Sequence, residues 1–233
     1  MPSPALPALE FAPWRLSGLV CGALLNDPAQ LAALGEAVHA PPYKAPPRAP
    51  VLYLKPRNTL ATDGAATEVP AEAGKLVIGA TLGMVIGRAA CRVPAERAMD
   101  FIAGWVLVAD LFVPHVSFYR PSVRQRARDA SCVIGPVLPR DALARPDALE
   151  LRLSVNGRLV QRANTAAMSR PVARLLQDVS AFMTLAPGDL LLLGVSHGAP
   201  QAGAGDRYEL AAPGLSQLRG ELVAETVPVA VDP

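Results

Sequence analysis

Two long apolar runs in the middle of the chain constrain its fold more than any other feature. They cover Val77–Arg88 and Val106–Asp110, and each is rich in β-branched residues and bounded by glycine or by a charge. Such runs are typical of buried strands. Between them, Pro94 stands where the first turn of a helix tolerates proline, and Gly104 follows the expected helix end near Ile102. We therefore expect a strand, a short helix and a second strand.

Asp110 is the first candidate site residue. It is the ionisable residue at the end of the second apolar run. A carboxylate in such a position is costly unless it is ion-paired, hydrogen-bonded or bound to a metal. The sequence therefore predicts that Asp110 has specific partners, and Arg126 is one candidate for an ion pair.

Two predicted hairpins account for much of the second half of the chain. Apolar and polar residues alternate over 149–155, and Asn156-Gly157, a dipeptide typical of tight hairpin turns, follows them. The segments 207–211 and 218–225 form the second pair. Both hairpins indicate antiparallel sheet.

Helices are fewer than strands. Apolar residues recur every three or four positions over 169–183, which predicts an amphipathic helix. Asp27-Pro28 provides a cap and a first-turn proline for another helix that we expect to reach about His39. Short strands with three helices indicate a mainly β, α+β domain rather than a regular parallel α/β fold.

Prolines mark the predicted domain boundary. Five prolines lie in 41–50, which predicts an extended connector. We expect residues 1–49 to form an N-terminal arm and a small helix-containing segment, and residues 50–233 to form the main domain. Within the first part, the proline-rich segment Met1–Pro13 is expected to be a loose arm.

Composition excludes several classes of protein. With 22 Lys and Arg against 20 Asp and Glu the net charge is +2, and no long basic run is present, so nucleic acid is not an expected partner. Three widely spaced cysteines without a CxxC pair argue against a disulfide framework and a zinc site. Because the sequence shows no apolar run long enough to span a bilayer, we expect a cytoplasmic protein that does not bind membranes.

Several sequence motifs, in order, resemble the fumarylacetoacetate hydrolase superfamily over roughly Val51 to Glu225. They include AMDFIAGWVLVAD, RDASCVIGPVL, LRLSVNGRLVQRANT, FMTLAPGDLLLLG and GDRYELAAPGLSQLRGELVAE. The resemblance implies a mixed β-sandwich roll or barrel with a few short helices. Two further segments, APPYKAPPRAPVLYLKPRNT and GATLGMVIGRAACRV, look like the amino-terminal half, or separate first subunit, of the bifunctional isomerase/decarboxylase of homoprotocatechuate (4-hydroxyphenylacetate) degradation.

The resemblance also implies a divalent cation, Mg²⁺ or Mn²⁺, held in active members by a Glu-x-Glu pair on one strand and an Asp at the end of the next. Residues two apart on a strand face the same side, so both carboxylates reach one ion. Here Gly79 and Thr81 stand where the two glutamates are expected, and Asp110 is the remaining ligand position. One carboxylate gives too few oxygens for such a cation. We therefore expect no metal in this chain and a metal in a homologous partner subunit.

Other departures from the family pattern also indicate a degenerate site. Arg126 takes the place of an expected lysine, and arginine keeps the charge but cannot transfer a proton at neutral pH. Ala167 and the segment Leu193–Val195 replace an aspartate and a Thr-Gly-Thr turn. His115 follows Asp110 and is a candidate general acid or base. We favour a structural, hydrogen-bonded histidine among aromatic side chains.

Basic residues near these positions are candidate substrate ligands. Lys55 and Arg57 follow a predicted strand, and Arg124 lies in an arginine-rich segment. Such side chains can hold a dicarboxylate through charge-assisted hydrogen bonds. A solvated surface is the alternative interpretation. The candidate catalytic residues are Asp110 with His115 and Arg126.

Three functional hypotheses remain open at this point. In the first, the chain is a subunit of a 5-oxopent-3-ene-1,2,5-tricarboxylate decarboxylase / 2-hydroxyhepta-2,4-diene-1,7-dioate isomerase, with a degenerate metal site and a homologous metal-binding partner. In the second, it is a self-sufficient homodimeric hydrolase or decarboxylase of 2-oxo dicarboxylic acids. In the third, it is a non-catalytic scaffold half. The first two imply a small 2-oxo dicarboxylate or tricarboxylate as substrate.

Overall fold

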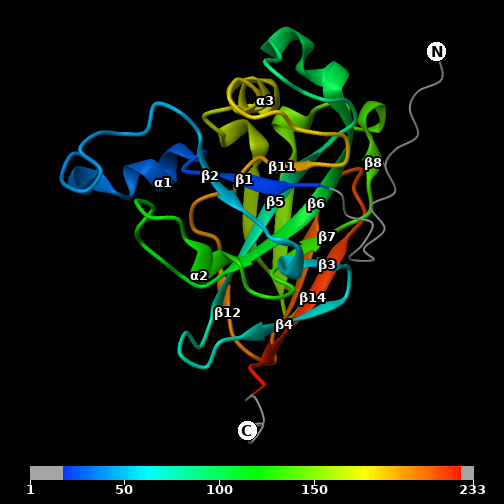
Figure 1. The fold of residues 1–233 in the computed structure, drawn as a ribbon. Helices are drawn as coiled ribbons and strands as arrows, with labels where there is room; N and C mark the ends of the chain where they lie inside the picture. The colour runs from blue at the N-terminus through cyan, green and yellow to red at the C-terminus, as the bar shows by residue number, and fades with distance from the viewer. Residues whose placement is uncertain (1–17, 227–233) are drawn as a thin grey trace, which may run out of the picture.

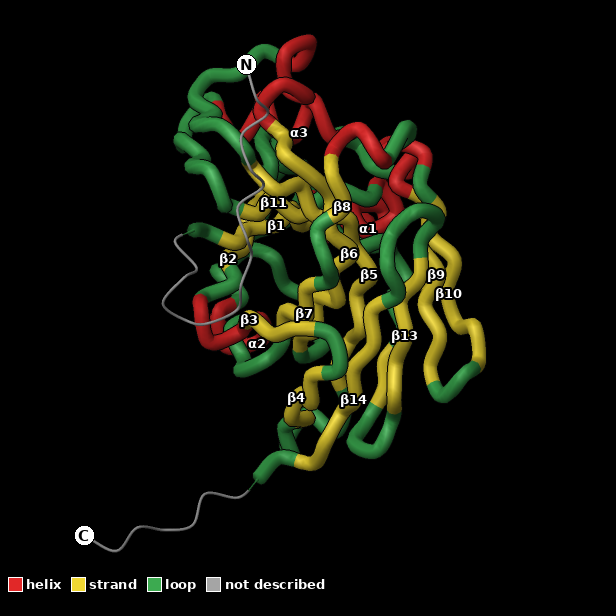
Figure 2. The backbone as a smooth tube through the Cα atoms, turned by 90° about the vertical axis from the view of Figure 1, so that its right-hand side faces the viewer, coloured by secondary structure: helices red, strands yellow, loops and turns green. Residues whose placement is uncertain are grey.

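The computed structural model describes residues 18–226. Two curled β-sheets pack against each other, and helix α3 lies at one end of them (Figure 1). Figure 2 shows the strands of the two sheets side by side. The mainly β, α+β architecture predicted from the sequence is confirmed.

The larger sheet has nine strands among the described residues. Their order is β2-β1-β11-β5-β6-β7-β3, with β12 paired to β5 and β8 paired to β6. Most neighbours are antiparallel, but β1 pairs parallel with β11, and β3 pairs parallel with β7. The strands of this sheet are β1 (Val20–Leu24), β2 (Val51–Leu54), β3 (Leu60–Thr62), β5 (Leu76–Ile86), β6 (Ile102–Phe112), β7 (Cys132–Ile134), β8 (Leu138–Pro139), β11 (Leu190–Leu192) and β12 (Gln201–Ala202).

The smaller sheet has the order β10-β9-β13-β14-β4. It contains both hairpins predicted from the sequence, β9 with β10 and β13 with β14. β4 joins β14 in parallel. Its strands are β4 (Ala65–Val69), β9 (Glu150–Val155), β10 (Arg158–Asn164), β13 (Arg207–Ala211) and β14 (Leu218–Ala224).

Strand β6 separates two apolar cores because its side chains alternate between the faces of the larger sheet. Leu107 and Leu111 face the core between the two sheets, where Leu153 of β9 and Leu210 of β13 also lie. On the other face lies a second cluster, which includes Val108. Asp110 shares the strand face of Val108, so its carboxylate enters the second core.

The larger sheet curls on itself around this second core. In the strand order, β1, β11 and β5 separate β2 from β6. Nevertheless the Tyr53 hydroxyl of β2 donates a hydrogen bond of 2.6 Å to Oδ2 of Asp110 in β6. An open, flat sheet could not bring these residues together, since neighbouring strands are about 4.8 Å apart. The curl therefore brings residues of distant strands together around Asp110.

The longest α-helix of the described chain is α3 (Val172–Ser180), as the apolar spacing predicted. Its buried face carries Leu175, Leu176 and Val179. The short helix expected between the two central strands is confirmed, and it is the 3₁₀ helix η3 (Ala95–Phe101). The remaining helices are short: α1 (Pro28–Ala32), α2 (Val123–Arg126), η1 (Gly35–Val38), η2 (Arg57–Thr59), η4 (Arg140–Ala142), η5 (Pro146–Ala148) and η6 (Thr165–Ala167). Within residues 18–226, none has the length and apolar character of a membrane-spanning helix.

The N-terminal part contributes directly to the larger sheet. β1 pairs with β2 on one side and with β11 on the other. Asp27 caps α1 through its side chain, as expected, but the helix ends at Ala32 and η1 follows, with Gly35 at φ +50° interrupting the continuous helix we expected. The boundary between residues 1–49 and 50–233 stays a prediction, and the expected arm Met1–Pro13 lies outside the described residues.

Candidate functional site

The candidate site is centred on Asp110, whose side chain is fully buried on the inner face of the curled sheet. Gly79 of β5 is its partner in the strand register. Three side chains contact the carboxylate: Tyr53 of β2, Lys55 just after β2, and Arg126 of α2. Ser131, in the segment before β7, contacts Lys55, and all four residues are buried.

Both oxygens of the Asp110 carboxylate are occupied. Lys55 Nζ lies 2.7 Å from Oδ1, and the side chains of both residues are fully buried. On the other oxygen, Oδ2, Arg126 Nη1 donates at 2.8 Å and the Tyr53 hydroxyl at 2.6 Å. The predicted ion pair between Asp110 and Arg126 is thus confirmed. Two cationic side chains and a phenol surround one carboxylate.

Lys55 is fixed in place by the backbone around it. Its Nζ donates to the carbonyl oxygens of Leu111 at 3.0 Å, Arg126 at 2.9 Å and Ser131 at 3.0 Å. An ammonium group has three protons. Since these are directed at the three carbonyls, the contact with Asp110 is best described as an ion pair. Lys55 is therefore an internal counter-ion with its donors engaged.

Arg126 is held between two aromatic rings. Its guanidinium carbon lies 3.8 Å from the ring centroid of Phe112 and 4.4 Å from that of Tyr53. Cations stack favourably on aromatic faces, and more so where water is excluded. Nη1 points to Asp110, whereas Nε is buried with no hydrogen-bond partner among the described residues.

The surroundings shift the pKa of two groups in this cluster. Burial alone would raise the pKa of Asp110, but Lys55 and Arg126 hold it below the usual value, so the carboxylate is charged. Burial raises the pKa of Tyr53 well above its usual value, and the nearby Asp110 charge adds to this. The phenol is therefore neutral and donates its proton to Asp110.

The residues opposite Asp110 do not fit a divalent cation. A Cβ on Gly79 would lie 2.5 Å from Cγ2 of Val195 and 2.9 Å from the carbonyl oxygen of Asp110, so a longer side chain has no room there. Thr81 is buried, and its hydroxyl accepts a hydrogen bond of 3.2 Å from the Gly194 amide. Within residues 18–226, no group of three or more His, Cys, Asp or Glu side chains is placed to hold a metal. The lysine and arginine instead supply the positive charge beside Asp110.

A cavity of about 510 Å³ lies next to this cluster. Its walls come from α1, from the end of β6 with the segment that follows it, and from the segment 195–201. Arg126, His115 and Ser196 are among the polar residues that line it. The cluster and the cavity share Arg126, which pairs with Asp110 and also lines the cavity.

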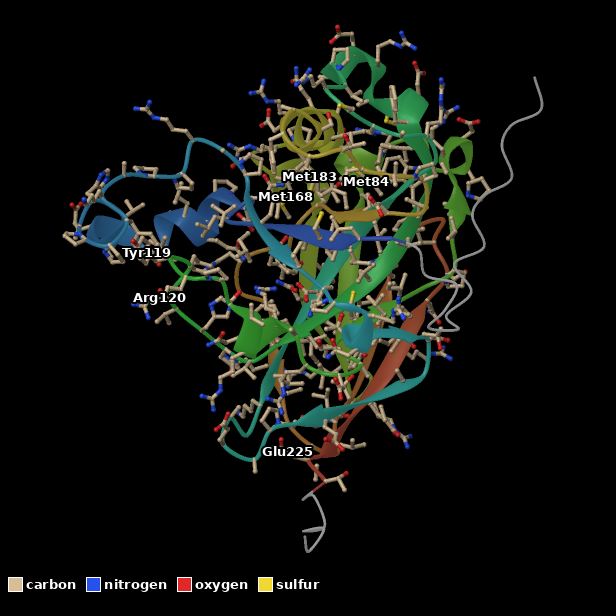
Figure 3. All side chains as sticks on the ribbon, in the orientation of Figure 1. Met84, Tyr119, Arg120, Met168, Met183 and Glu225 are labelled. Atoms are coloured by element: carbon tan, nitrogen blue, oxygen red, sulfur yellow. The ribbon has the colours of Figure 1, made fainter. Side chains whose placement is uncertain are left out.

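The segment that follows β6 lies against the N-terminal part of the chain. The Phe118 amide donates to the Tyr43 hydroxyl at 2.7 Å, and the rings of Tyr43 and Tyr119 meet edge to face at 6.1 Å. Figure 3 shows Tyr119 and Arg120 beside the α1 region. Phe118 also lines the cavity, so its hydrogen bond to Tyr43 ties one wall of the cavity to the N-terminal part of the chain.

Of the residues predicted from the sequence, Asp110, Lys55 and Arg126 come together, and His115 lies near them. The His115 ring packs against Phe112 and Phe118, with centroid distances of 5.8 and 5.2 Å, which is the aromatic neighbourhood we expected. Arg57 is exposed and does not join this cluster. Arg124 is also exposed and pairs with Glu72 at 2.9 Å. Their assignment as substrate ligands stays a prediction.

Sequence reasoning missed Tyr53, Ser131 and Ser196. Tyr53 had a usable signal, because it stands two positions before Lys55 on a predicted strand and must face the same side. Ser131 and Ser196 belong to loops, and nothing in their local sequence indicates their contacts.

Comparison with known proteins identifies the family. The model of the fumarylacetoacetate (FAA) hydrolase C-terminal family matches residues 19–223. The chain belongs to the fumarylacetoacetate hydrolase family. The superfamily resemblance and the fold predicted from it are thereby confirmed.

Relatives within the fumarylacetoacetate hydrolase family include bifunctional enzymes. The 4-hydroxyphenylacetate degradation bifunctional isomerase/decarboxylase of Salmonella dublin is 38% identical over 210 residues, which are 90% of this chain and 48% of the relative. The chain therefore spans about half the length of the curated relatives it matches.

Solved structures of the fumarylacetoacetate hydrolase family agree in fold. The 2-hydroxyhepta-2,4-diene-1,7-dioate isomerase from Mycobacterium marinum is 28% identical with a TM-score of 0.74, covering 90% of this chain and 76% of that one. Fumarylpyruvate hydrolase from Pseudomonas aeruginosa, in complex with Mn²⁺ and pyruvate, has a TM-score of 0.77 at 24% identity, with 89% and 90% covered. Mn²⁺ thus occurs in a protein with this fold.

Proposed function

We propose that this chain is the metal-free subunit of a 5-oxopent-3-ene-1,2,5-tricarboxylate decarboxylase / 2-hydroxyhepta-2,4-diene-1,7-dioate isomerase that acts in aromatic (4-hydroxyphenylacetate) catabolism. It works together with a homologous subunit that holds Mg²⁺ or Mn²⁺. The names of the relatives support the reaction class. The match to about half of a bifunctional relative supports a partner domain or subunit.

The observation that carries the proposal is the occupied Asp110 carboxylate. In a metal centre its oxygens would face the ion, whereas here they face Lys55, Arg126 and Tyr53. Displacing these groups would leave two buried cations without their counter-ion, which is costly. Val195 fills the space above Gly79. The chain has thus replaced the ion with its own side chains.

In this proposal the chain contributes stability, interface and the walls of a pocket, while the metal-dependent step takes place in the partner. Lys55 and Arg126 neutralise Asp110 without an ion, so the fold does not depend on metal supply. The small apolar residues at positions 79 and 195 keep the former ion position closed to water. A cytoplasmic location is part of the same proposal.

The proposal is tested by metal analysis and by reconstitution. The chain is purified after growth with added Mn²⁺, and its metal content is measured by mass spectrometry; we expect well below one ion per chain. It is then co-expressed with a homologue that carries the Glu-x-Glu pair, and the mixture is analysed by size-exclusion chromatography with light scattering. A stable complex that is more active than the homologue alone supports the proposal. A stoichiometric metal in the isolated chain, or no complex, would overturn it.

A further inference from the structure

The segment 113–119 lies between β6 and α2, and most of its residues are exposed. Val116, for example, is 89% exposed. A hydrogen bond of 2.7 Å from the Phe118 amide to the Tyr43 hydroxyl ties the segment to the N-terminal part of the chain. His115 is half-buried and lies against the core side of the segment. Mostly exposed segments of this kind are the ones that open locally at low cost in free energy.

His115 attaches the segment to the end of β6. The centroid of its ring lies 5.8 Å from that of Phe112 and 5.2 Å from that of Phe118. Nδ1 lies 3.1 Å from the carbonyl oxygen of Ser117. A carbonyl can only accept a hydrogen bond, so Nδ1 carries the proton of the neutral ring. Nε2 is buried without a hydrogen-bond partner among the described residues, so the ring fits this place in its neutral form.

A second proton on the His115 ring does not fit the same place. It would put an N–H group at Nε2, where no described residue offers an acceptor. It would also put a positive charge next to Arg126, whose guanidinium carbon lies 3.8 Å from the ring centroid of Phe112, the ring that contacts His115. Burial, followed by the charge of Arg126, accordingly lowers the pKa of His115.

The charged and titratable groups around His115 come from several elements. β6 supplies Asp110, which raises the pKa of His115 but is already paired with Arg126 of α2. The loop after β11 supplies His197, which is exposed. On the N-terminal side, Asp27 accepts hydrogen bonds from two backbone amides, and the Tyr43 hydroxyl accepts one. The described residues that line the cavity include no Asp or Glu, so no free carboxylate there offsets a second proton.

We propose that His115 is a pH-sensitive switch, in which protonation of the ring releases the segment 113–119 and opens the cavity on that side. The protonated ring turns out into water, where both of its N–H groups find acceptors. Pro114 and Val116 line the cavity together with His115 and Phe118, so their release widens its entrance. The inference goes beyond the proposed function and does not depend on it, because it requires neither a metal nor a partner subunit.

The direction of the switch follows from proton linkage. The closed arrangement binds the second proton less readily than the open one, in which the His115 ring has its ordinary pKa of 6.5. The closed arrangement is therefore fully favoured above that value, and it loses stability as the pH falls from there through the lower pKa of the closed form. The segment should be closed at neutral pH and open in mild acid.

Hydrogen–deuterium exchange of the purified chain tests this directly. The Phe118 amide, which donates to Tyr43, reports on the segment, and the Leu175 amide, which donates to Pro171 within α3, reports on the rest of the fold. Exchange is measured at about pH 7.5 and about pH 5.5, with labelling times scaled for the chemical exchange rate. At the lower pH we expect the protection of the Phe118 amide to fall by at least about twofold and that of Leu175 to stay unchanged. Unchanged protection of Phe118, or an equal loss at both amides, would overturn the proposal.

Histidine substitutions identify the group that titrates. His115→Phe keeps an aromatic ring between Phe112 and Phe118 but cannot take up a proton, so the protection of the Phe118 amide should be the same at both pH values. His39→Phe and His197→Gln alter the two other histidines of the chain, which are exposed, and should behave as the wild type does. A pH effect that persists in His115→Phe, or that disappears in His197→Gln, would contradict the proposal.

The reverse effect, of the segment on the proton, provides a second test. Because linkage is reciprocal, loosening the segment must raise the pKa of His115. Tyr43→Phe removes the acceptor of the Phe118 amide and keeps the ring that meets Tyr119. In a nuclear magnetic resonance titration of the three histidine rings, the pKa of His115 should move up toward 6.5 in this variant. An unchanged pKa of His115 in Tyr43→Phe would show that the ring and the segment are not coupled, and the proposal would fail.

Discussion

Lys55 Nζ lies 2.7 Å from Oδ1 of Asp110, and neither side chain has exposed surface. The pair joins the end of β2 to the end of β6 across the curled sheet. An ion pair in this setting contributes little net stability as a whole, because both charges lose their hydration. Removing one partner is far more costly, since the other charge remains buried.

Lys55→Met should therefore destabilise the chain strongly. The substitution removes one hydrogen-bond donor from each of the carbonyls of Leu111 and Ser131, and it removes one of the two cations beside Asp110. We expect a loss of about 3–5 kcal/mol in the free energy of unfolding, measured by urea denaturation. Arg57→Met, at an exposed position two residues later, should change it by less than about 0.5 kcal/mol. A loss below about 1 kcal/mol for Lys55→Met would show that Lys55 is not the internal counter-ion.

Asp110→Asn should be comparably destabilising for the opposite reason, since it leaves Lys55 and Arg126 as neighbouring buried cations. The expected loss is about 3–5 kcal/mol at neutral pH. Asp141→Asn is the matched control, because the Asp141 side chain is 84% exposed and also pairs with an arginine. Its effect should stay within about 0.5 kcal/mol.

The Asp110 carboxylate should also make the free energy of unfolding depend on pH in the acid range. The pKa of Asp110 in the folded chain lies below the ordinary value of 3.8. The stability that its charged form supplies is thus present above that value and is lost as the pH falls through the folded pKa. Denaturation curves recorded from neutral to acid pH should show a steeper decline for the wild type than for Asp110→Asn. Parallel curves for the two proteins would contradict this.

The cysteines provide a separate test of the buried core. Burial raises the pKa of Cys21 and of Cys132 from 9.0 to about 12, whereas Cys91 is exposed. Iodoacetamide applied to the native chain should therefore label Cys91, and mass spectrometry should find the other two labelled only after unfolding. Rapid native labelling of Cys132 would mean that the inner core is open.

The buried thiols also predict a pH dependence at the alkaline side. Because the thiols release their protons at lower pH in the unfolded chain than in the folded chain, the free energy of unfolding should fall as the pH rises above 9.

Local pattern was sufficient to predict much of this fold. The two central strands, both hairpins and α3 follow from apolar periodicity and from turn residues such as Asn156-Gly157, which are properties of neighbouring residues in the chain. The short helix expected between the two central strands is present as the 3₁₀ helix η3; proline, an early glutamate and a later glycine mark a helix start and stop without distinguishing the two helix types. At η1 the positive φ of Gly35 interrupts a pattern that otherwise indicates one helix.

Part of the candidate site was also predictable from neighbouring residues in the sequence. A carboxylate at the end of a buried run requires partners, and the arginine-rich segment that follows it in the sequence makes Arg126 a candidate. Tyr53 and Lys55 reach Asp110 because the larger sheet curls, and curling is a tertiary property that strand patterns do not encode. The packing of Val195 over Gly79 likewise joins segments that are more than a hundred residues apart in the sequence.

That packing gives the final prediction. A Cβ at position 79 would lie 2.5 Å from Cγ2 of Val195 and 2.9 Å from the carbonyl oxygen of Asp110. Gly79→Ala should therefore destabilise the chain by about 1–3 kcal/mol through overpacking. Val195→Ala removes the nearer obstacle, so the double variant should lose less than the sum of the two single losses, by more than about 0.5 kcal/mol in a double-mutant cycle. Strictly additive losses would show that the strand can shift to admit a side chain at position 79, and the argument that a glutamate has no room there would then fail.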